Sequence, residues 1–322
     1  MQCHCFSLLL VISIASKKTG GGVCSFIVRR IKGLYLPYIK WSLVFLLMHN
    51  IFYHLNLYNG THGFRVQVSH LYSWDEFAKK AFNIVFKMSD TEQLLGAFWF
   101  IRALFIASVS VALLHFIFRR IQMFNRFIIL PFLLFLAYIA TKYDIKLPWM
   151  GSLGLVLFSS FFFVAGFSYR KIESKKFYTY IAIFISTAVT FCGLLYFHQV
   201  TGVLGIKDEY IIPYSLVALS GILMVLNLSK WIEGYSIRSF LYYVGNNTMI
   251  ILALHFISLK IVTLLKIWIY GWPIERLAEF PVIEENNTYW WILYSIVGTI
   301  IPIIVQLTYS KSKLFFVNNE TA

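Results

Sequence analysis

The sequence predicts an all-α protein: a polytopic bundle of transmembrane helices, with about eight full spans and a short apolar stub at its N-terminus. Of its 322 residues, 59% are hydrophobic and only 13% are charged, whereas soluble domains are about half apolar and one quarter charged. Apolar stretches recur along the whole chain, and no polar stretch between them is long enough to fold alone. We therefore expect one integral membrane domain over residues 1–322.

Composition also argues against several other classes of protein. The formal net charge is +14, but the cations stand at the ends of apolar stretches rather than in a basic arm, so we expect no nucleic-acid partner. The four cysteines, Cys3, Cys5, Cys24 and Cys192, lack the spacing of a metal site or a disulfide framework. We expect neither a bound metal nor disulfide bonds.

The first apolar stretch, Phe6–Ala15, is the stub. It is shorter than the roughly 20 residues that a spanning helix needs. A secretory signal peptide would carry its positive charge before the apolar run, but here Lys17 and Lys18 follow it. We interpret the stub as the second half of a membrane helix.

The first complete span is predicted at Leu34–Leu55, and Arg29, Arg30 and Lys32 precede it. Lysine and arginine collect at the cytoplasmic ends of membrane helices. The three cations are therefore either a topology signal in contact with lipid headgroups or a binding site for the phosphates of a cytoplasmic ligand. Guanidinium groups suit the second role because they bind phosphate with two parallel hydrogen bonds.

A long polar connector, Asn56–Leu94, follows the first span. Within it, Trp74–Met88 has acidic residues early and lysines later, with apolar residues at helical spacing. This pattern predicts an amphipathic helix, which either lies in the membrane interface or is a solvated loop helix. The expected apolar face consists of Phe77, Ala81, Ile84 and Val85.

The remaining spans follow at shorter intervals. Connectors on the side of Arg29 hold more cations than those on the opposite side, so the positive-inside rule places the C-terminus in the cytoplasm. The sequence thus predicts a multi-pass protein of the plasma or inner membrane. The expected spans are Leu95–Phe118, Phe127–Thr141, Met150–Tyr169, Phe177–Phe197, Tyr210–Leu228, Gly245–Lys266 and Tyr289–Tyr309.

His255 lies within the predicted span Gly245–Lys266, where an ionisable side chain is costly and usually faces a bundle interior or a wet cavity. It is either a structural histidine or part of a reaction site. Asn246, at the start of this span, is either a helix cap or a substrate contact. Lys260 is expected to extend towards the outer interface.

Trp99 and Arg102 lie near the outer end of another span. They either belong to an interfacial aromatic belt with a neighbouring cation or contact a carbohydrate. His49 and His54, at the outer end of the first span, are weaker candidates. The sequence shows no Ser-His-Asp order and no glycine-rich phosphate loop.

Four segments, taken in order, resemble the membrane acyltransferase type 3 family, whose members O-acylate cell-envelope sugars. The resemblance extends over nearly the whole chain from the basic segment onward. The segments are RRIKGLYLPYIKW (Arg29–Trp41), GAFWFIRALF (Gly96–Phe105), FFFVAGFSYRK (Phe161–Lys171) and FLYYVGNNTMIILALHF (Phe240–Phe256).

This resemblance implies O-acetylation, or transfer of a similar acyl group, from acetyl-CoA or another acyl-CoA to a hydroxyl of a capsule, an exopolysaccharide or a lipid-linked sugar. A sugar hydroxyl is a poor nucleophile, so a base must remove its proton during attack on the thioester. The expected partners are acyl-CoA, the glycan acceptor and the lipid bilayer. We assign acyl-CoA binding to Arg29, Arg30 and Lys32, catalysis to His255, and glycan binding to Trp99, Arg102 and Asn246.

The sequence departs from the family pattern at its start. The family carries an essential histidine and an arginine on a first membrane helix, and the stub corresponds to the helix that follows it. His4 is not in the matching context, so we expect the family's first helix to be missing. An inactive family member is therefore one alternative. A polysaccharide exporter is another, although we find no repeat between the halves of the chain that would favour a transporter.

Overall fold

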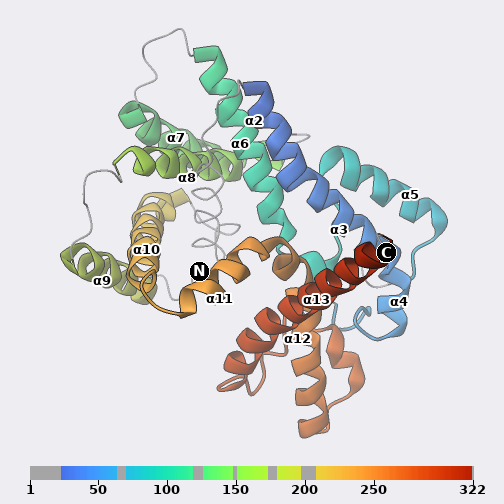
Figure 1. Cartoon of the computed structure of the whole chain (residues 1–322). Helices are drawn as coiled ribbons and strands as arrows, with labels where there is room; N and C mark the ends of the chain where they lie inside the picture. The colour runs from blue at the N-terminus through green and yellow to red at the C-terminus, as the bar shows by residue number, and fades with distance from the viewer. Residues whose placement is uncertain are drawn as a thin grey trace. The chain divides into compact units, whose positions relative to one another are not determined.

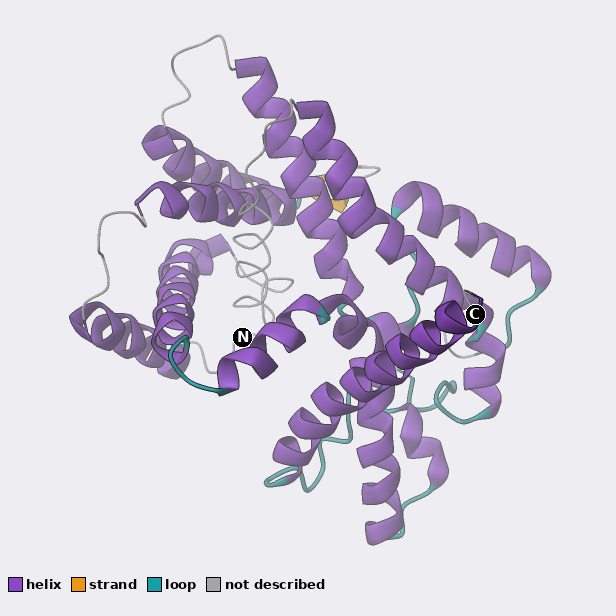
Figure 2. Cartoon of the chain, viewed as in Figure 1, coloured by secondary structure: helices purple, strands orange, loops and turns teal. Residues whose placement is uncertain are grey.

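The computed structural model describes residues 23–63, 70–118, 126–147, 151–172, 180–196 and 208–320. Helices dominate these residues (Figure 2). Within these ranges, the strands are β1 (Lys146–Leu147) and β2 (Gly151–Ser152), a short antiparallel pair with Lys146 opposite Ser152. The all-α prediction is confirmed, whereas the stub Phe6–Ala15 lies outside the described residues.

The chain divides into two compact units. Unit 1 comprises Met1–Tyr35 and Phe100–Arg238, and unit 2 comprises Leu36–Trp99 and Ser239–Ala322. This division follows contacts, so the prediction of one functional domain stays a prediction.

The helices of each unit are labelled in Figure 1. Unit 1 holds α2 (Val23–Arg30), η1 (Ile31–Tyr35), most of α6 (Phe98–Phe118), α7 (Arg126–Lys142), α8 (Leu153–Ile172), α9 (Tyr180–Tyr196), η6 (Asp208–Tyr210) and α10 (Ile211–Ile232). Unit 2 holds α3 (Leu36–Leu47), α4 (His49–His54), α5 (Trp74–Phe82), η3 (Asn83–Lys87), η4 (Gln93–Leu95), most of α11 (Ile237–Asn246), α12 (Thr248–Tyr270), η7 (Ile274–Ala278) and α13 (Trp290–Glu320).

Unit 1 is built from helix pairs: α7 packs against α8, and α9 packs against α10. Its interior is aliphatic and aromatic, as expected for helices that must bury apolar faces against each other. One cluster joins Leu133 of α7 to Phe161 and Val164 of α8. A second joins Ala137, Phe158 and Ile211.

The contact between α7 and α8 depends on a glycine. A Cβ added at Gly154 would overlap the Thr141 side chain and lie 3.1 Å from the Thr141 backbone nitrogen. We expect Gly154→Ala to lower the melting temperature of the purified protein, because overpacking a helix contact costs about 1–3 kcal/mol. Gly245→Ala is the control, since a Cβ there meets nothing within 4 Å. Equal melting temperatures for the two variants would contradict this packing.

Three described helices are long and apolar enough to cross a membrane: Ile211–Ile232, Thr248–Tyr270 and the Trp290–Ser310 part of α13. They coincide with the last three predicted spans. The predicted total of about eight full spans is not confirmed. The other apolar segments found among the described residues are parts of α6, α7, α8 and α9 that are shorter than a span: Phe98–Leu113, Ile128–Lys142, Leu153–Gly166 and Ile183–Gly193.

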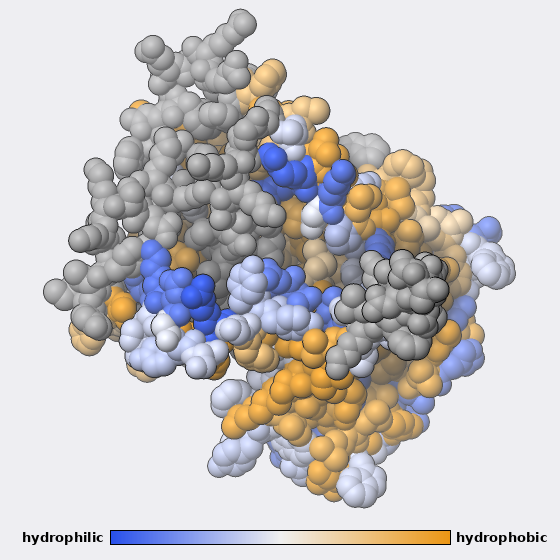
Figure 3. Space-filling view, in the orientation of Figure 1, coloured by the Kyte–Doolittle hydropathy of each residue, from blue (hydrophilic) through white to orange (hydrophobic). Residues whose placement is uncertain are grey.

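In unit 2, α12 packs against α13, and the surface over α13 is hydrophobic (Figure 3). Large apolar side chains are exposed along both helices, which suits contact with lipid. They include Leu264, Leu265, Ile296, Ile300 and Ile304.

The amphipathic segment predicted at Trp74–Met88 forms α5 and the π-helical turn η3, which both pack against α3. Ser73 and Glu76 form a reciprocal capping box at the start of α5. Hydrogen bonds from His70 and Ser73 lower the pKa of Glu76 to about 2. Ile84 of the predicted apolar face is buried inside the protein. A second, aromatic face is exposed and consists of Trp74, Phe82 and Phe86.

Candidate functional site

The basic segment folds into α2 and η1 of unit 1. Arg29 and Lys32 are exposed, whereas Arg30 is only 2% exposed. Its guanidinium lies over the ring of Phe26, 4.6 Å from the centroid, and over the ring of Phe163, at 5.5 Å. The three cations of the basic segment therefore have two different environments.

The guanidinium of Arg30 is a buried charge that has no counter-charge within the described ranges. None of its three nitrogen atoms has a hydrogen-bond partner among the described residues. Burial, with a smaller effect from the neighbouring Arg29, lowers the pKa of Arg30 to about 10, so the group is still charged at neutral pH. Because buried polar groups in folded proteins are nearly always paired, this guanidinium is a candidate site for an anion such as phosphate.

Arg102, on α6, also belongs to unit 1. It is half-buried, and a Cβ added at Gly151 would lie 3.7 Å from its Nη2 atom. Trp99, one turn earlier on α6, is half-buried and falls in unit 2. The predicted role of both residues in glycan binding stays a prediction.

His255 lies on α12 in unit 2 and is half-buried. Its Nδ1 atom is 2.9 Å from the carbonyl oxygen of Leu252. A carbonyl oxygen only accepts, so Nδ1 carries the hydrogen, and Nε2 of the neutral ring is the basic atom. The tautomer that Leu252 selects is the one that a general base at Nε2 requires.

Asn246 is the last residue of α11 and is exposed. Asn247 occupies the cap position of α12, but its Nδ2 atom donates to the Tyr243 carbonyl instead of its side chain accepting from the helix. The cap alternative for Asn246 is therefore wrong, and its alternative role as a substrate contact stays a prediction. The preceding helix end supplies a competing acceptor that the local sequence pattern does not reveal.

His49, a weaker candidate from the sequence, belongs to a buried pair in unit 2. His49 on α4 is fully buried, and its Nδ1 atom is 2.9 Å from Oε2 of Glu92, which is 2% exposed. Its Nε2 atom is 3.0 Å from the carbonyl oxygen of His70. The imidazole also stacks on the ring of Tyr72, with centroids 3.3 Å apart.

The contacts of His49 limit which atoms of the His49–Glu92 pair can carry a hydrogen. The His70 carbonyl can only accept, so Nε2 of His49 donates to it. The hydrogen between Nδ1 and Glu92 then belongs either to an imidazolium facing a carboxylate or to a carboxylic acid facing a neutral ring. Burial and the charge of Glu92 raise the pKa of Tyr58 and of Tyr72, so both phenols stay neutral.

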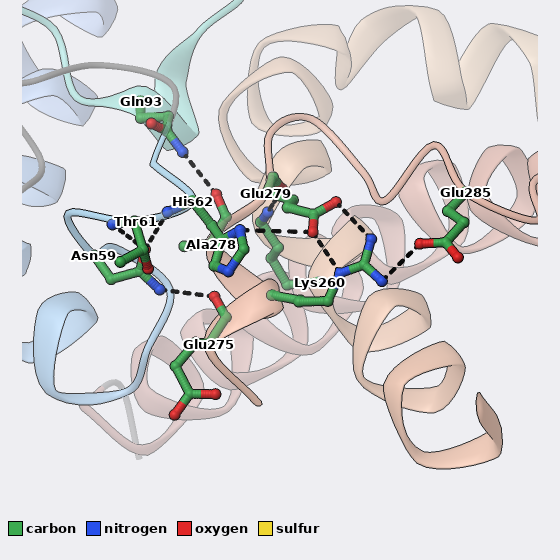
Figure 4. Close-up of polar contacts among 10 residues, drawn as sticks. Asn59, Thr61, His62, Gln93, Lys260, Glu275, Ala278, Glu279 and Glu285 are labelled. Atoms are coloured by element: carbon green, nitrogen blue, oxygen red, sulfur yellow. Dashed lines mark hydrogen bonds and ion pairs between the residues drawn. The ribbon is translucent and has the colours of Figure 1, made fainter. Parts of the chain in front are cut away.

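Polar contacts join two connectors of unit 2, the one after α4 and the one after α12 (Figure 4). Arg276 is held by two carboxylates, and its hydrogen bonds to Glu279 and Glu285 raise its pKa. The prediction that both connectors lie on the outer side of the membrane stays a prediction. The contacts between them are Asn59 Nδ2 to the Glu275 carbonyl (2.7 Å), Gln93 Nε2 to the Ala278 carbonyl (3.3 Å) and His62 Nδ1 to Glu279 Oε1 (3.8 Å).

Comparison with known proteins decides the family. A family model described as "Acyltransferase domain" matches residues 5–307, nearly the whole chain. The chain belongs to the acyltransferase type 3 family. No curated protein and no solved structure matches it.

The predicted site residues of this acyltransferase-family protein fall in both units. Arg29, Arg30, Lys32 and Arg102 are in unit 1, whereas Trp99, Asn246 and His255 are in unit 2. In the described part of the chain, no three His, Cys, Asp or Glu side chains are grouped so that they could hold a metal ion.

Sequence reasoning missed the environments of His49, Glu92 and Lys260. The partners of His49 lie 43 and 21 residues away along the chain, so no local pattern marks it. Lys260 does not extend to the interface as expected: it is 2% exposed and donates to the Glu279 carbonyl. The sequence did contain one signal for Lys260. A lysine in the middle of a span is energetically costly, so its side chain is expected to bond to another group.

Proposed function

We propose that this protein is a membrane O-acyltransferase that moves an acetyl or similar acyl group from acyl-CoA to a hydroxyl of a cell-surface polysaccharide or lipid-linked sugar. The observation that carries the proposal, beyond family membership, is the buried guanidinium of Arg30, which has no hydrogen-bond partner in the part of the chain that the structure describes. We place the protein in the plasma or inner membrane, with Arg29, Arg30, Lys32 and the C-terminus on the cytoplasmic side, where acyl-CoA is found.

The donor site uses charge. Acyl-CoA carries phosphate groups, and the guanidinium of Arg30 offers them hydrogen bonds that are stronger because they form out of water. Arg29 and Lys32, which are exposed, attract the donor and contact the outer phosphate oxygens.

The reaction itself is an acyl exchange between sulfur and oxygen. The sugar hydroxyl oxygen attacks the thioester carbonyl carbon while Nε2 of His255 takes the hydroxyl proton. The carbon–sulfur bond then breaks, and the CoA thiolate leaves and recovers that proton. Apolar helices around the reacting groups limit the competing attack by water.

Membranes that contain the protein, incubated with acetyl-CoA labelled in its acetyl group and with the host's glycan, test this function. We expect alkali-labile label in the glycan, and none with membranes that lack the protein. Absence of label, with the full-length chain present, would contradict the proposal. Movement of glycan across vesicles without acyl-CoA would favour an exporter, and binding of acyl-CoA without turnover would indicate an inactive member.

His255→Ala is expected to lower the rate of transfer by about 10²–10⁴-fold, the usual contribution of a general base. Affinity for acyl-CoA and insertion into the membrane should be unchanged, because the Nδ1 contact of His255 stays within its own helix. The matched control is His54→Ala, which removes an exposed histidine of the same unit. Normal turnover of the His255 variant would show that the residue is structural.

A further inference from the structure

The connector between α12 and α13 enters the interior of unit 2. Leu277, Ala278 and Ile283 are 3%, 0% and 0% exposed, although connectors between membrane helices normally run over the surface. The segment Glu279–Ile283 is not helical. It is an irregular stretch of backbone beside a membrane span, in which Ile283 is buried, Glu279, Phe280 and Val282 are half-buried and Pro281 is exposed.

Its contacts with α12 show how deep it lies. The ring of Phe280 is 4.7 Å from the ring of Phe256. Phe256 precedes the end of α12, Tyr270, by 14 residues, which is about 21 Å at 1.5 Å per residue. Since the hydrocarbon core of a bilayer is about 30 Å thick, Phe280 lies well inside the span. Glu279–Ile283 is therefore a re-entrant segment.

Two lysines of α12 donate to backbone carbonyls of this segment, and Figure 4 shows one of them, Lys260. Irregular backbone at membrane depth is tolerated only where protein groups replace water as hydrogen-bond partners. Lys260 donates to the Glu279 carbonyl at 2.5 Å, and Lys266 donates to the Ile283 carbonyl at 2.9 Å. The two side chains are 2% and 0% exposed. Such costly groups indicate that the position of the segment matters.

The Phe280 ring packs against Gly96, where there is no room for a larger residue. A Cβ added at Gly96 would lie 2.7 Å from Phe280 Cζ, closer than non-bonded atoms approach. The ring therefore rests between Gly96 and Phe256, and Phe256 is the immediate neighbour of His255. This places the tip of the re-entrant segment at the level of His255 on α12.

We propose that Glu279–Ile283 is a plug that closes unit 2 to water at the level of His255, and that Lys260 is the positioning residue that holds it. The inference rests on the proposed function, because a thioester near His255 must be shielded from water. With the plug displaced, a water oxygen attacks the thioester carbonyl carbon, the carbon–sulfur bond breaks, and the products are the free acid and CoA thiol.

Cysteine labelling in lipid nanodiscs tests the position of the plug without any activity. In a chain whose native cysteines are replaced by serine, Ile283→Cys should react with a water-soluble maleimide far more slowly than its exposed neighbour Glu284→Cys. Adding Lys260→Met should speed labelling at position 283 by about tenfold or more, the factor expected for loss of one hydrogen bond from a charged donor. Lys260→Arg should restore slow labelling. Equal rates at positions 283 and 284 in the parent, or no effect of Lys260→Met, would overturn the proposal.

Gly96→Ala is expected to displace the plug without removing a charged group. It is the alternative test if the Lys260→Met variant does not fold. It should also speed labelling at position 283, whereas Gly245→Ala should not. In the acetyl-CoA assay, Lys260→Met should raise the ratio of hydrolysis to transfer. Faster labelling with an unchanged ratio would overturn the water-excluding role. If the protein without these substitutions neither transfers nor hydrolyses the acyl group of acyl-CoA, the proposed function is refuted. The labelling rates at position 283 would still test the plug in that case.

Discussion

Replacing Arg30 by methionine is expected to weaken the binding of acyl-CoA by about 10–100-fold, the loss that follows from removing hydrogen bonds between a charged donor and phosphate. The folded protein should remain nearly as stable. No described group pairs with the guanidinium, so the substitution leaves no partner unsatisfied and removes a buried charge. Methionine also keeps contact with the rings of Phe26 and Phe163 through its polarisable sulfur.

Two measurements separate a binding role from a structural one. Equilibrium binding of acyl-CoA to the purified protein gives the affinity, and thermal unfolding without ligand gives the stability. Arg29→Met is the matched control, because the same charge is removed from an exposed neighbour. We expect it to weaken binding less than Arg30→Met does. Unchanged affinity of the Arg30 variant, or a large loss of stability, would show that this cation serves topology or packing.

Removing one member of the His49–Glu92 pair is expected to destabilise the protein strongly. His49→Leu leaves the Glu92 carboxyl group, which is 1% exposed, without its partner. If the pair is ionised, this loss costs about 3–5 kcal/mol. The segment that carries His70 and Tyr72 also loses its contact with the imidazole. Unfolding of the purified protein by heat or by a denaturing detergent measures the loss.

A double-variant cycle distinguishes an unpaired charge from lost packing. His49→Leu combined with Glu92→Leu should be more stable than the single His49→Leu variant, because no buried charge is left unpaired. The exposed His54→Leu should change stability by less than about 0.5 kcal/mol. If the two single losses simply add in the double variant, the pair contributes through packing alone.

The helical class and the position of several spans could be predicted because membrane hydropathy is a local property. About 20 consecutive residues decide whether a segment is apolar enough to span a bilayer. Three predicted spans therefore coincide with helices of the structure, although the ends differ: Tyr210–Leu228, Gly245–Lys266 and Tyr289–Tyr309. The α12 helix begins at Thr248 and continues to Tyr270, where Gly271 in the left-handed conformation ends it. Hydropathy alone does not mark this end.

The environments of the charged residues could not be predicted in the same way. Arg29 and Arg30 are adjacent and chemically identical, yet one is exposed and the other is buried between two aromatic rings. Local sequence cannot separate them, because Phe163, which completes that environment, comes from a distant helix. Lys260 is a second example. Its position in a span indicates that burying its charge costs free energy, but the sequence does not show which group accepts its hydrogen bond.

The sequence by itself determined that this is a helical membrane protein with a basic segment before its first span, because composition and charge act over short windows. Only the tertiary structure decided that Arg30 is buried with no partner among the described residues, that His49 faces Glu92, and that two lysines donate to the connector between α12 and α13. The hydrogen bond from Lys260 to Glu279 joins residues 19 apart, and the contact of His49 with Glu92 joins residues 43 apart. A buried polar group is stabilised by whichever partner the fold brings within hydrogen-bond distance, and that partner is set by packing rather than by neighbours in sequence.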